Sequence, residues 1–484
     1  MSVPTTFPGV HRNYINGEFV ESAETMKVLN PSTGGVIATV PAASEEETAA
    51  AIAAAKAAQP AWAALPNIER AGYLRKIAAL LRDRADEFAD MLVVEQGKTR
   101  GLATVEANFS ADYLDYMAEW ARRIEGEVIP SDRAGEMILL TRRPIGVVGG
   151  ILPWNFPFFL IARKMAPALL TGNTIVINPS SETPVNALEF AKLVDEAGVP
   201  AGVFNLVSGR GRVVGETLST HPDVGMISMT GSVSVGKRIM EKAAPTLTRV
   251  NLELGGKAPA IVLASADLDL AAKAIWDSRV INTGQVCNCA EVVLVEDAVH
   301  DELVAKLKEL FDATRYGDTS EIEELDMGPL ITESALDDVA GMVERACEAG
   351  ANLVTGGSRA EGKGDGWFFE PTILDGVKPD MEIAKEEIFG PVLPVVRVKD
   401  LDEALEIANA SRFGLTSSVY TDDLNQALKA VEGLQYGETY VNRENFEAMQ
   451  GFHAGRRESG IGGADGKHGL LEFTETHVAY IQRN

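Results

Sequence analysis

Short apolar segments that alternate with helix-like segments are the feature that most restricts the fold of this chain. Apolar runs lie at 145–152, 174–177, 203–207 and 224–229, with helix-like stretches at 187–197 and 211–219. A second series begins with an apolar run at 260–263 and a helical stretch at 268–281, and it continues to about Tyr440. This alternation is typical of parallel sheets whose strands are joined by helices. It predicts two α/β domains.

The first 125 residues have a helical character instead. Ser44, with Glu47 three residues later, predicts a capping box that opens a helix over the following alanine-rich run. Apolar residues at three- and four-residue spacing predict further helices over 67–94 and 104–123. Glycines make 455–469 the loop that looks most flexible.

Composition excludes several classes of protein. The chain has 484 residues, too many for one compact core, and 46% hydrophobic with 24% charged residues is ordinary for a soluble protein. The excess of 70 Asp and Glu over 44 Lys and Arg gives a net charge of −26, which disfavours a nucleic-acid partner. The acidity could equally serve solubility alone. We expect no signal peptide at Met1–Thr6, no membrane segment, and a cytoplasmic location that keeps three cysteines reduced.

Two residues carry the strongest chemical signal. Cys287 lies in Gly284-Gln285-Val286-Cys287, and Glu253 lies in Leu252-Glu253-Leu254-Gly255-Gly256. A thiolate can attack a carbonyl carbon, and a carboxylate can activate the thiol or the water that later releases the acyl group. The alternatives are a buried structural thiol and a carboxylate that caps a turn or pairs with Lys257. Cys289 is interpreted as a small residue that lines the pocket and Cys347 as structural, and no metal site is expected because a lone Cys-x-Cys is a weak metal signal.

These two segments resemble the signature blocks of the aldehyde dehydrogenase superfamily, together with the blocks 153–157 (PWNFP) and 386–391 (EEIFGP). The resemblance runs from about Tyr14 to the C-terminus and is closest to the bacterial enzymes that act on lactaldehyde. It implies a Rossmann-like NAD-binding domain (1–125 and 147–255), an α/β catalytic domain (256–455) and a small β oligomerisation region (126–146 and 456–484). Within that last region, strands are expected at 136–143 and 476–482. They are implied to take part in subunit assembly, in a homo-oligomer that is a dimer or a tetramer.

The resemblance also assigns catalytic roles. Cys287 is implied to be the nucleophile and Glu253 the base. Asn155 is implied to stabilise the oxyanion together with the backbone N–H of Cys287, a contribution of about a hundredfold to a thousandfold in rate. Lys164 is expected near them as a positive or structural support. Asn155 could instead be a turn residue, and Lys164 could be part of a salt bridge.

The resemblance places NAD, with NADP as the alternative, along glycine-containing turns. The turn from Thr230 to Gly236 opens a helix, whose N-terminus favours phosphate, whereas Gly209-x-Gly211-x-x-x-Gly215 departs from the usual dinucleotide spacing. The cofactor-binding residues expected are Leu152, Pro153, Trp154, Asn178, Pro179, Ser180, Ser181, Gly211, Gly215, Glu216, Thr230, Gly231, Ser232, Leu254, Glu387 and Phe389.

The sequence departs from its relatives after the run 175–177. They usually carry a lysine and, three residues later, a glutamate that grip the adenosine ribose, whereas this chain has Asn178 and Ser181. Losing the lysine removes a cation that favours a 2′-phosphate, and losing the glutamate removes the charge that rejects one. Glu182 could restore that repulsion, so NAD is preferred over NADP.

Four hydrogen-bonding residues indicate the substrate class. Arg163, Asn288, Glu447 and His453 match the positions that contact a small hydroxylated aldehyde in the similar enzymes. We therefore expect oxidation of lactaldehyde or glycolaldehyde to the acid. Alternatively, Arg163 and Glu447 could form an ion pair with a structural role only. A dehydrogenase of another polar semialdehyde, such as succinic semialdehyde, and a catalytically silent nucleotide-binding protein are the rival functions.

Overall fold

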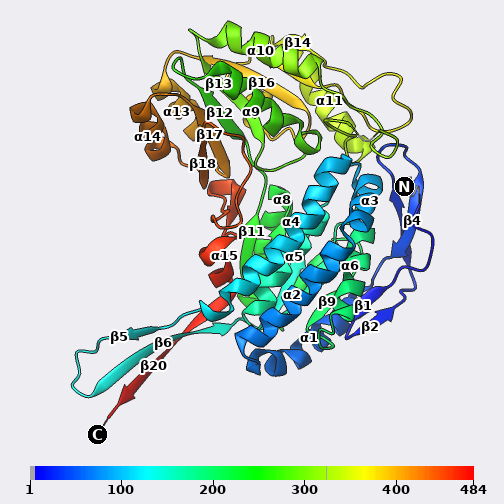
Figure 1. Cartoon of the computed structure of the whole chain (residues 1–484), viewed down its shortest axis with the longest axis vertical. Coiled ribbons are helices and arrows are strands. Elements are labelled where there is room, and N and C mark those ends of the chain that lie inside the picture. The colour runs from blue at the N-terminus through cyan, green and yellow to red at the C-terminus, as the bar shows by residue number, and fades with distance from the viewer. Residues whose placement is uncertain (1–5, 323, 484) are drawn as a thin grey trace.

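The computed structural model describes residues 6–322 and 324–483, which form two large sheets, each with helices, and two small ones (Figure 1). Residues 1–5, on which much of the expectation about a signal peptide depends, lie outside this range. None of the helices in the described ranges has the length and apolar character needed to cross a bilayer.

The first large sheet has the strand order β19-β11-β10-β7-β8-β9-β1-β2. Its central strands are parallel, as the sequence pattern predicts: β7 (Val147–Ile151), β8 (Thr174–Asn178), β9 (Phe204–Leu206), β10 (Val224–Thr230) and β11 (Arg249–Glu253). The edge strands are antiparallel: β1 (Asn13–Ile15), β2 (Glu18–Val20) and β19 (Gly460–Ile461). Nearly all residues of β7–β9 are buried because helices cover both faces.

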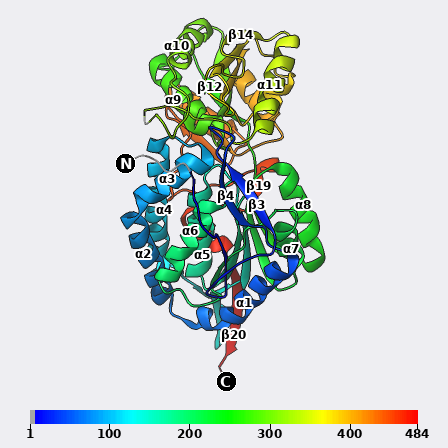
Figure 2. The same ribbon diagram turned by 90° about the vertical axis from the view of Figure 1, so that its right-hand side faces the viewer.

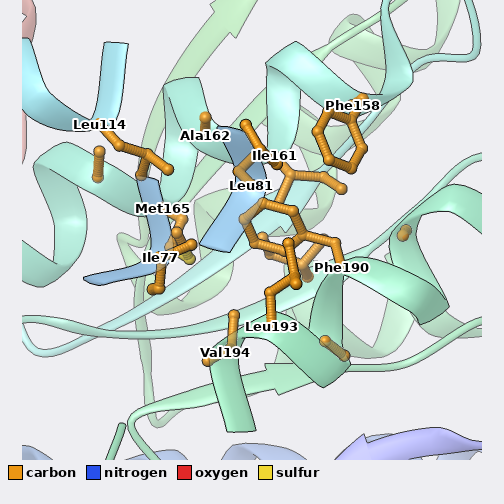
Figure 3. Packing of buried hydrophobic residues seen from close by; sticks show 14 of the residues in the cluster. Ile77, Leu81, Leu114, Phe158, Ile161, Ala162, Met165, Phe190, Leu193 and Val194 are labelled. Atoms are coloured by element: carbon orange, nitrogen blue, oxygen red, sulfur yellow. The ribbon is translucent and has the colours of Figure 1, made fainter. Parts of the chain in front are cut away.

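Alternate residues of these strands pack on opposite faces. Val148 and Ile175 join the core formed with α2 (Asn67–Asp83), α3 (Ala85–Gln96), α4 (Arg100–Glu119), α5 (Pro157–Leu170) and α6 (Val185–Glu196). Val147 and Val176 join the core formed with α1 (Glu45–Ala64), α7 (Val214–Thr220) and α8 (Val233–Ala243). The period of two residues in a strand produces this division. Figure 3 shows part of the first core, with labelled residues Ile77, Leu81, Leu114, Phe158, Ile161, Ala162, Met165, Phe190, Leu193 and Val194.

Three predicted helices differ in how well they match the structure. The capping box is present, since the Ser44 hydroxyl accepts from Glu47 N and the Glu47 carboxylate accepts from Ser44 N. The single helix expected over 67–94 is wrong, because Arg84 leaves the helical region at φ −120° and separates α2 from α3. The helix expected over 104–123 begins earlier, as α4, and ends in a short 3₁₀ turn at Trp120–Arg122.

The second large sheet has the order β14-β15-β16-β13-β12-β17-β18. Its strands are β12 (Ala258–Val262), β13 (Ala290–Glu296), β14 (Asn352–Thr355), β15 (Thr372–Asp375), β16 (Val392–Val398), β17 (Thr416–Tyr420) and β18 (Glu438–Val441). All neighbours are parallel except β14 and β15. The connecting helices are α9 (Leu268–Val280), α10 (His300–Asp312), α11 (Glu333–Glu348), α12 (Glu382–Lys385), α13 (Leu401–Asn409) and α14 (Leu424–Gly433).

A small sheet projects from the body as an arm that ends near the C-terminus (Figures 1 and 2). It contains β5 (Glu127–Ile129), β6 (Glu136–Pro144) and β20 (Thr474–Gln482), and β20 pairs along the whole length of β6. A separate hairpin joins β3 (Thr25–Leu29) to β4 (Val36–Pro41). The sequence prediction groups 456–484 with the small sheet and expects a flexible loop at 455–469. The structure differs within 456–473, which contributes β19 to the first sheet and forms α15 (Gly466–Glu472) beside α5.

Candidate active site

Cys287 lies on a tightly constrained segment between α9 and β13. Asn282 and Thr283 have positive φ angles of 48° and 61°, and Gly284 follows at 72°. A Cβ atom at Gly284 would lie 2.3 Å from the carbonyl oxygen of Gly390, so a side chain does not fit there. The buried Arg279 guanidinium donates to the carbonyls of Gly284 (2.9 Å) and Ala290 (2.8 Å). These contacts fix the position of the thiol, since they hold the chain on both sides of it.

Glu253 is the last residue of β11, at the carboxyl edge of the first sheet. One oxygen of its carboxylate accepts a hydrogen bond of 3.1 Å from Thr230, its neighbour on β10. The other oxygen, Oε1, is buried and has no hydrogen-bond partner in the described part of the chain. Burial favours the neutral acid, but the positive charges of Arg163 and Lys164 hold the pKa of Glu253 below its usual value. Glu253 is therefore an ionised carboxylate with one free oxygen.

Two cavities meet at these residues. Both are lined by Asn155, Thr230, Glu253 and Cys287. A molecule in either cavity can therefore reach the Cys287 sulfur. We call the first the inner cavity and the second the nucleotide-side cavity. The shared wall is where a reaction between two bound molecules can occur.

Asn155 precedes α5 and is fixed by several contacts. Its Nδ2 donates to the carbonyl of Gln285 (3.0 Å), and its Oδ1 accepts from Phe156 N (3.1 Å). Its own backbone carbonyl accepts from Lys98 Nζ (2.8 Å). The amide nitrogen thus faces the segment that carries Cys287, and one of its two N–H groups remains available.

Lys164 lies behind the cavities and does not line them. Its Nζ donates to Ser228 (3.2 Å), and burial lowers its pKa to about 8. The structure therefore places it where its charge acts on Glu253 without contact with a bound molecule.

The four predicted substrate residues line the inner cavity together. Arg163 lies 3.5 Å from Glu447, and Asn288 donates to the same carboxylate. The ion pair that we considered as an alternative is therefore present, but it is one part of a larger cluster. His453 Nδ1 lies 3.0 Å from Glu438 on β18. Aromatic rings, among them Phe109, Phe159 and Phe446, line the rest of the cavity.

Sequence reasoning missed the main partner of Arg163. Asp465 accepts from Arg163 Nε (3.0 Å) and also from Nη2, and both side chains are buried. Asp465 has a positive φ of 70°, an angle rare for residues other than Gly, Asn and Asp. It lies within the segment that we expected to be a flexible loop, and its buried position distinguishes it from Glu458, the other acidic residue there.

The match with known proteins agrees with this geometry. A family model described as "Aldehyde dehydrogenase family" matches residues 19–479. The chain belongs to the aldehyde dehydrogenase family. It is 58% identical to lactaldehyde dehydrogenase of Escherichia coli K12 over 100% of both chains. The crystal structure of the E. coli lactaldehyde dehydrogenase superposes with a TM-score of 0.97, covering 99% of this chain and 100% of that one.

A structure of betaine aldehyde dehydrogenase from Staphylococcus aureus in complex with NAD⁺ is also similar, at 32% identity and a TM-score of 0.95, covering 98% of this chain and 95% of that one. The family, its fold and its use of a nicotinamide dinucleotide, as the sequence resemblance implied, are thereby confirmed.

The nucleotide-side cavity of this dehydrogenase contains residues suited to the nicotinamide half of the cofactor. The predicted cofactor residues that line it are Pro153, Trp154, Thr230, Gly231, Ser232, Leu254, Glu387 and Phe389. Ser232 caps α8, whose N-terminus offers N–H groups to a phosphate. A Cβ atom at Gly255 would lie 2.2 Å from the Glu387 carboxylate. Glycine is therefore required at this position for the Glu387 side chain to line the nucleotide-side cavity.

A third cavity lies at the carboxyl end of β7, beside α7 and α8. It is lined by the predicted residues Gly211, Gly215 and Glu216, and also by Arg238 and Lys242 of α8. Glu216 pairs with Arg238 (2.6 Å) and Lys242 (2.8 Å). The residues present therefore fit a dinucleotide whose adenosine half lies beside α7 and α8.

Asn178 occupies a different kind of position from the one expected. Its side chain is buried and donates to the carbonyl of Val207 (3.0 Å), so it holds the chain after β9 and lines none of the three cavities. Leu152 is buried and donates its N–H to the Asn178 carbonyl (3.0 Å). Pro179, Ser180 and Ser181 follow β8. Ser181 donates to Glu182 (3.3 Å), which is exposed at the end of the strand.

Proposed function

We propose that this dehydrogenase oxidises a short 2-hydroxyaldehyde, lactaldehyde or glycolaldehyde, to the carboxylic acid with NAD. The observation that carries the proposal is the shared wall of the two cavities, with Cys287 and Glu253 in it and a polar cluster in the inner cavity. The 58% identity to a lactaldehyde dehydrogenase over the whole chain supports the same substrate class.

The residues suggest a sequence of steps. The Cys287 thiolate adds to the aldehyde carbon, and Asn155 Nδ2 with the backbone N–H of Cys287 donates to the oxyanion. Bound NAD supplies the hydride acceptor. A thioester on Cys287 then remains. Glu253, with its free Oε1, takes a proton from the water that hydrolyses this thioester.

The charges around Arg163 favour a hydroxyl over a carboxylate on the substrate. Three carboxylates surround the guanidinium, those of Asp465, Glu447 (3.5 Å) and Glu253 (3.9 Å). Its positive charge is therefore already compensated, and a substrate carboxylate would add a fourth negative group to a buried site. A hydroxyl can donate to Glu447 and accept from Arg163 at no such cost. This argument disfavours succinic semialdehyde.

NAD is proposed over NADP because Glu182 is exposed beside Ser181, just after β8, where the family resemblance places the adenosine ribose. Its negative charge would repel a 2′-phosphate. Steady-state kinetics with both nucleotides test this directly: Glu182→Ala should raise kcat/KM for NADP about tenfold, a change of ~1.4 kcal/mol, and should leave that for NAD within twofold. A wild-type preference for NADP contradicts the assignment.

We further propose that the arm joins copies of the chain in a homo-oligomer that works in the cytoplasm. Val128 is 74% exposed on β5 and Tyr480 is 68% exposed on β20, so apolar surface remains uncovered at the edge of the small sheet. All three cysteines are free, which suits a reducing compartment. Light scattering after size exclusion distinguishes a monomer from a dimer or a tetramer, and cell fractionation tests the location.

Initial-rate kinetics on a panel of lactaldehyde, glycolaldehyde, propionaldehyde and succinic semialdehyde tests the substrate. We expect the two hydroxyaldehydes to have the highest kcat/KM. A preference for succinic semialdehyde overturns the assignment, and comparable rates on propionaldehyde would show that the polar cluster does not recognise the hydroxyl.

Two variants test the mechanism. Cys287→Ser should abolish turnover, whereas Glu253→Gln should retain a burst of NADH and lose steady-state turnover. A Cys287→Ser variant that kept most of its activity would refute the mechanism. A wild-type protein that turned over none of these aldehydes would favour the catalytically silent alternative.

A further inference from the structure

Glu291, the second residue of β13, is a buried carboxylate that accepts four hydrogen bonds. Its Oε2 accepts from Lys257 Nζ (3.0 Å) and from the backbone N–H of Ile388 (2.9 Å). Its Oε1 accepts from Arg279 Nη1 (2.8 Å) and from the backbone N–H of Phe389 (3.2 Å). Although burial raises the pKa of Glu291, the charges of Arg279 and Lys257 hold it below its usual value. The group is therefore ionised.

The two backbone hydrogen bonds hold the chain beside the nucleotide-side cavity. Phe389 has a φ of 53°, a left-handed angle that is unfavourable for a bulky residue and persists where surrounding contacts impose it. Its ring meets that of Trp154 edge to face, with centroids 5.5 Å apart, and both residues line the cavity. Glu387 lines the same cavity and accepts from Gly256 N (2.8 Å). We call Glu387 and Phe389 the cofactor wall, and Glu291 fixes the backbone of this wall.

The ion pair between Glu291 and Arg279 connects the cofactor wall to the segment of the nucleophile. Arg279 Nη2 donates to the carbonyl of Gly284 (2.9 Å), three residues before Cys287. It also donates to the carbonyl of Gly390, which directly follows the cofactor wall. One buried ion pair thus contacts both the segment that carries the thiol and the segment that carries the wall.

We propose that Glu291 is a positioning residue for hydride transfer, because its ion pair with Arg279 holds the cofactor wall at a fixed distance from Cys287. This inference rests on the proposed function, since it concerns one step of that reaction. In that step the C–H bond of the substrate bound to Cys287 breaks, the hydride passes to NAD and a thioester forms. A displacement of about 1 Å between reacting groups can lower a rate about a hundredfold. Glu291 lines none of the three cavities described above, so it acts through the backbone of its neighbours.

A purely structural role is the alternative, and Glu95 provides a matched control for it. Glu95 is also a fully buried carboxylate that accepts from two consecutive backbone N–H groups, those of Val185 and Asn186 at the start of α6. It lines none of the three cavities. Glu95→Gln should therefore reproduce the loss of such a group without any displacement of the cofactor wall.

The first test is stopped-flow measurement of the NADH burst in the full-length enzyme at saturating NAD and aldehyde. At pH 9.5, Glu95 and Glu387 are both ionised, since burial raises their pKa values only to about 7 and about 8. Glu291→Gln keeps the size of the side chain and removes its charge, so the rate constant of the burst should fall about 10- to 100-fold. It should fall further with aldehyde deuterated at C1, because hydride transfer then limits the burst.

The rate constant and the amplitude of the burst separate the two roles. Loss of folded protein reduces the amplitude and leaves the rate constant unchanged, which is the result expected for Glu95→Gln. A displaced cofactor wall lowers the rate constant of every molecule. Alkylation of Cys287 by iodoacetamide without NAD should stay near the wild-type rate in Glu291→Gln, since Arg279 still donates to the carbonyl of Gly284.

A second test needs no turnover. Isothermal titration at pH 9.5 should show a Kd for NAD that is raised about tenfold in Glu291→Gln and changed by less than about twofold in Glu95→Gln. Glu291→Asp retains the charge on a shorter side chain and should give a burst rate constant between those of the wild type and Glu291→Gln. It also replaces Glu291→Gln in both tests if that variant does not fold.

An unchanged burst rate constant in the Glu291 variant, or an equal fall in Glu95→Gln, would overturn the inference. Failure of the proposed function looks different. An enzyme that preferred succinic semialdehyde would lose its substrate assignment, and the burst on that aldehyde would still measure the effect of Glu291. A protein that oxidised none of the aldehydes would lose the proposed function, and the inference would fail with it unless the Kd for NAD rose as expected.

Discussion

The guanidinium of Arg163 lies 3.9 Å from the carboxylate of Glu253, and both groups are buried in the wall of the inner cavity. One cation thus faces the expected position of the substrate hydroxyl and also holds the base of hydrolysis in its ionised form. Recognition of the substrate and release of the product are therefore coupled through a single side chain.

Arg163→Met should impair both functions. Charge-assisted hydrogen bonds contribute roughly 1.5–3 kcal/mol, so kcat/KM for lactaldehyde should fall about 10- to 100-fold, and less for propionaldehyde, which has no hydroxyl. Arg163 lowers the pKa of Glu253; its removal raises that pKa, so the acid limb of the hydrolysis rate should move to higher pH. Stopped-flow measurement of the steps after the NADH burst checks this. An acid limb that stayed in place in Arg163→Met would show that other groups determine the ionisation of Glu253.

Asp465 gives a prediction about stability. Asp465→Ala leaves a buried guanidinium without its main partner, and such a change typically costs about 3–5 kcal/mol. Asp465→Asn retains one acceptor and tolerates the positive φ of 70°, so it should cost less. Urea denaturation measures the free energy of unfolding of both Asp465 variants. Glu361→Ala, at an exposed position, is the control and should lower it by less than about 0.5 kcal/mol. Equal losses of unfolding free energy in the two Asp465 variants would contradict a stabilising role of the ion pair with Arg163.

The sequence was sufficient for the parts of the fold that depend on local pattern. Apolar runs and helical spacing located β7–β10, β12 and α9 within a few residues, since each strand is buried on both faces. The break at Arg84 was not predictable in this way, because the helical spacing continues across it.

The missed residues of the site depend on contacts between distant segments. Asp465 meets Arg163 across 302 positions of the chain, and Glu106 meets the start of α5 across about 52. A single sequence contains acidic residues at many such places, with no sign of which one becomes buried. Asn178 shows the reverse: its position followed from the resemblance, but its amide turned inward to Val207.

Glu387 should make cofactor binding depend on pH. Burial and the nearby Glu291 raise the pKa of Glu387 to about 8. The carboxylate accepts hydrogen bonds from ribose hydroxyls best when ionised, so the Kd for NAD should decrease as pH rises through about 8. Isothermal titration between pH 6.5 and 9.5 measures this, and Glu387→Gln should bind more weakly with no such dependence. A Kd independent of pH in the wild type would argue against contact between Glu387 and the cofactor.

Lys98 should prove important for the placement of Asn155. Its Nζ donates to the Asn155 carbonyl (2.8 Å) and pairs with Glu106, whose carboxylate accepts from Phe158 N (2.9 Å) and Phe159 N (3.0 Å) at the start of α5. Lys98→Met leaves Glu106 as an unpaired buried charge, at a cost of about 3–5 kcal/mol. It should also lower the rate of the NADH burst, because the Asn155 carbonyl then keeps only the longer hydrogen bond from Asn282 Nδ2 (3.2 Å).

The double variant Lys98→Met/Glu106→Gln separates these effects. The glutamine introduced in place of Glu106 can still accept from one N–H of α5 and carries no charge, so the double variant should be more stable than Lys98→Met alone by roughly 1–3 kcal/mol. The burst rate should nevertheless stay low, since the Asn155 carbonyl still lacks its hydrogen bond from Lys98. Lys192→Met, which removes an exposed lysine paired with Glu189, is the control and should cost under about 1 kcal/mol. A burst rate that recovered with stability would mean that Lys98 acts only on folding and not on the position of Asn155.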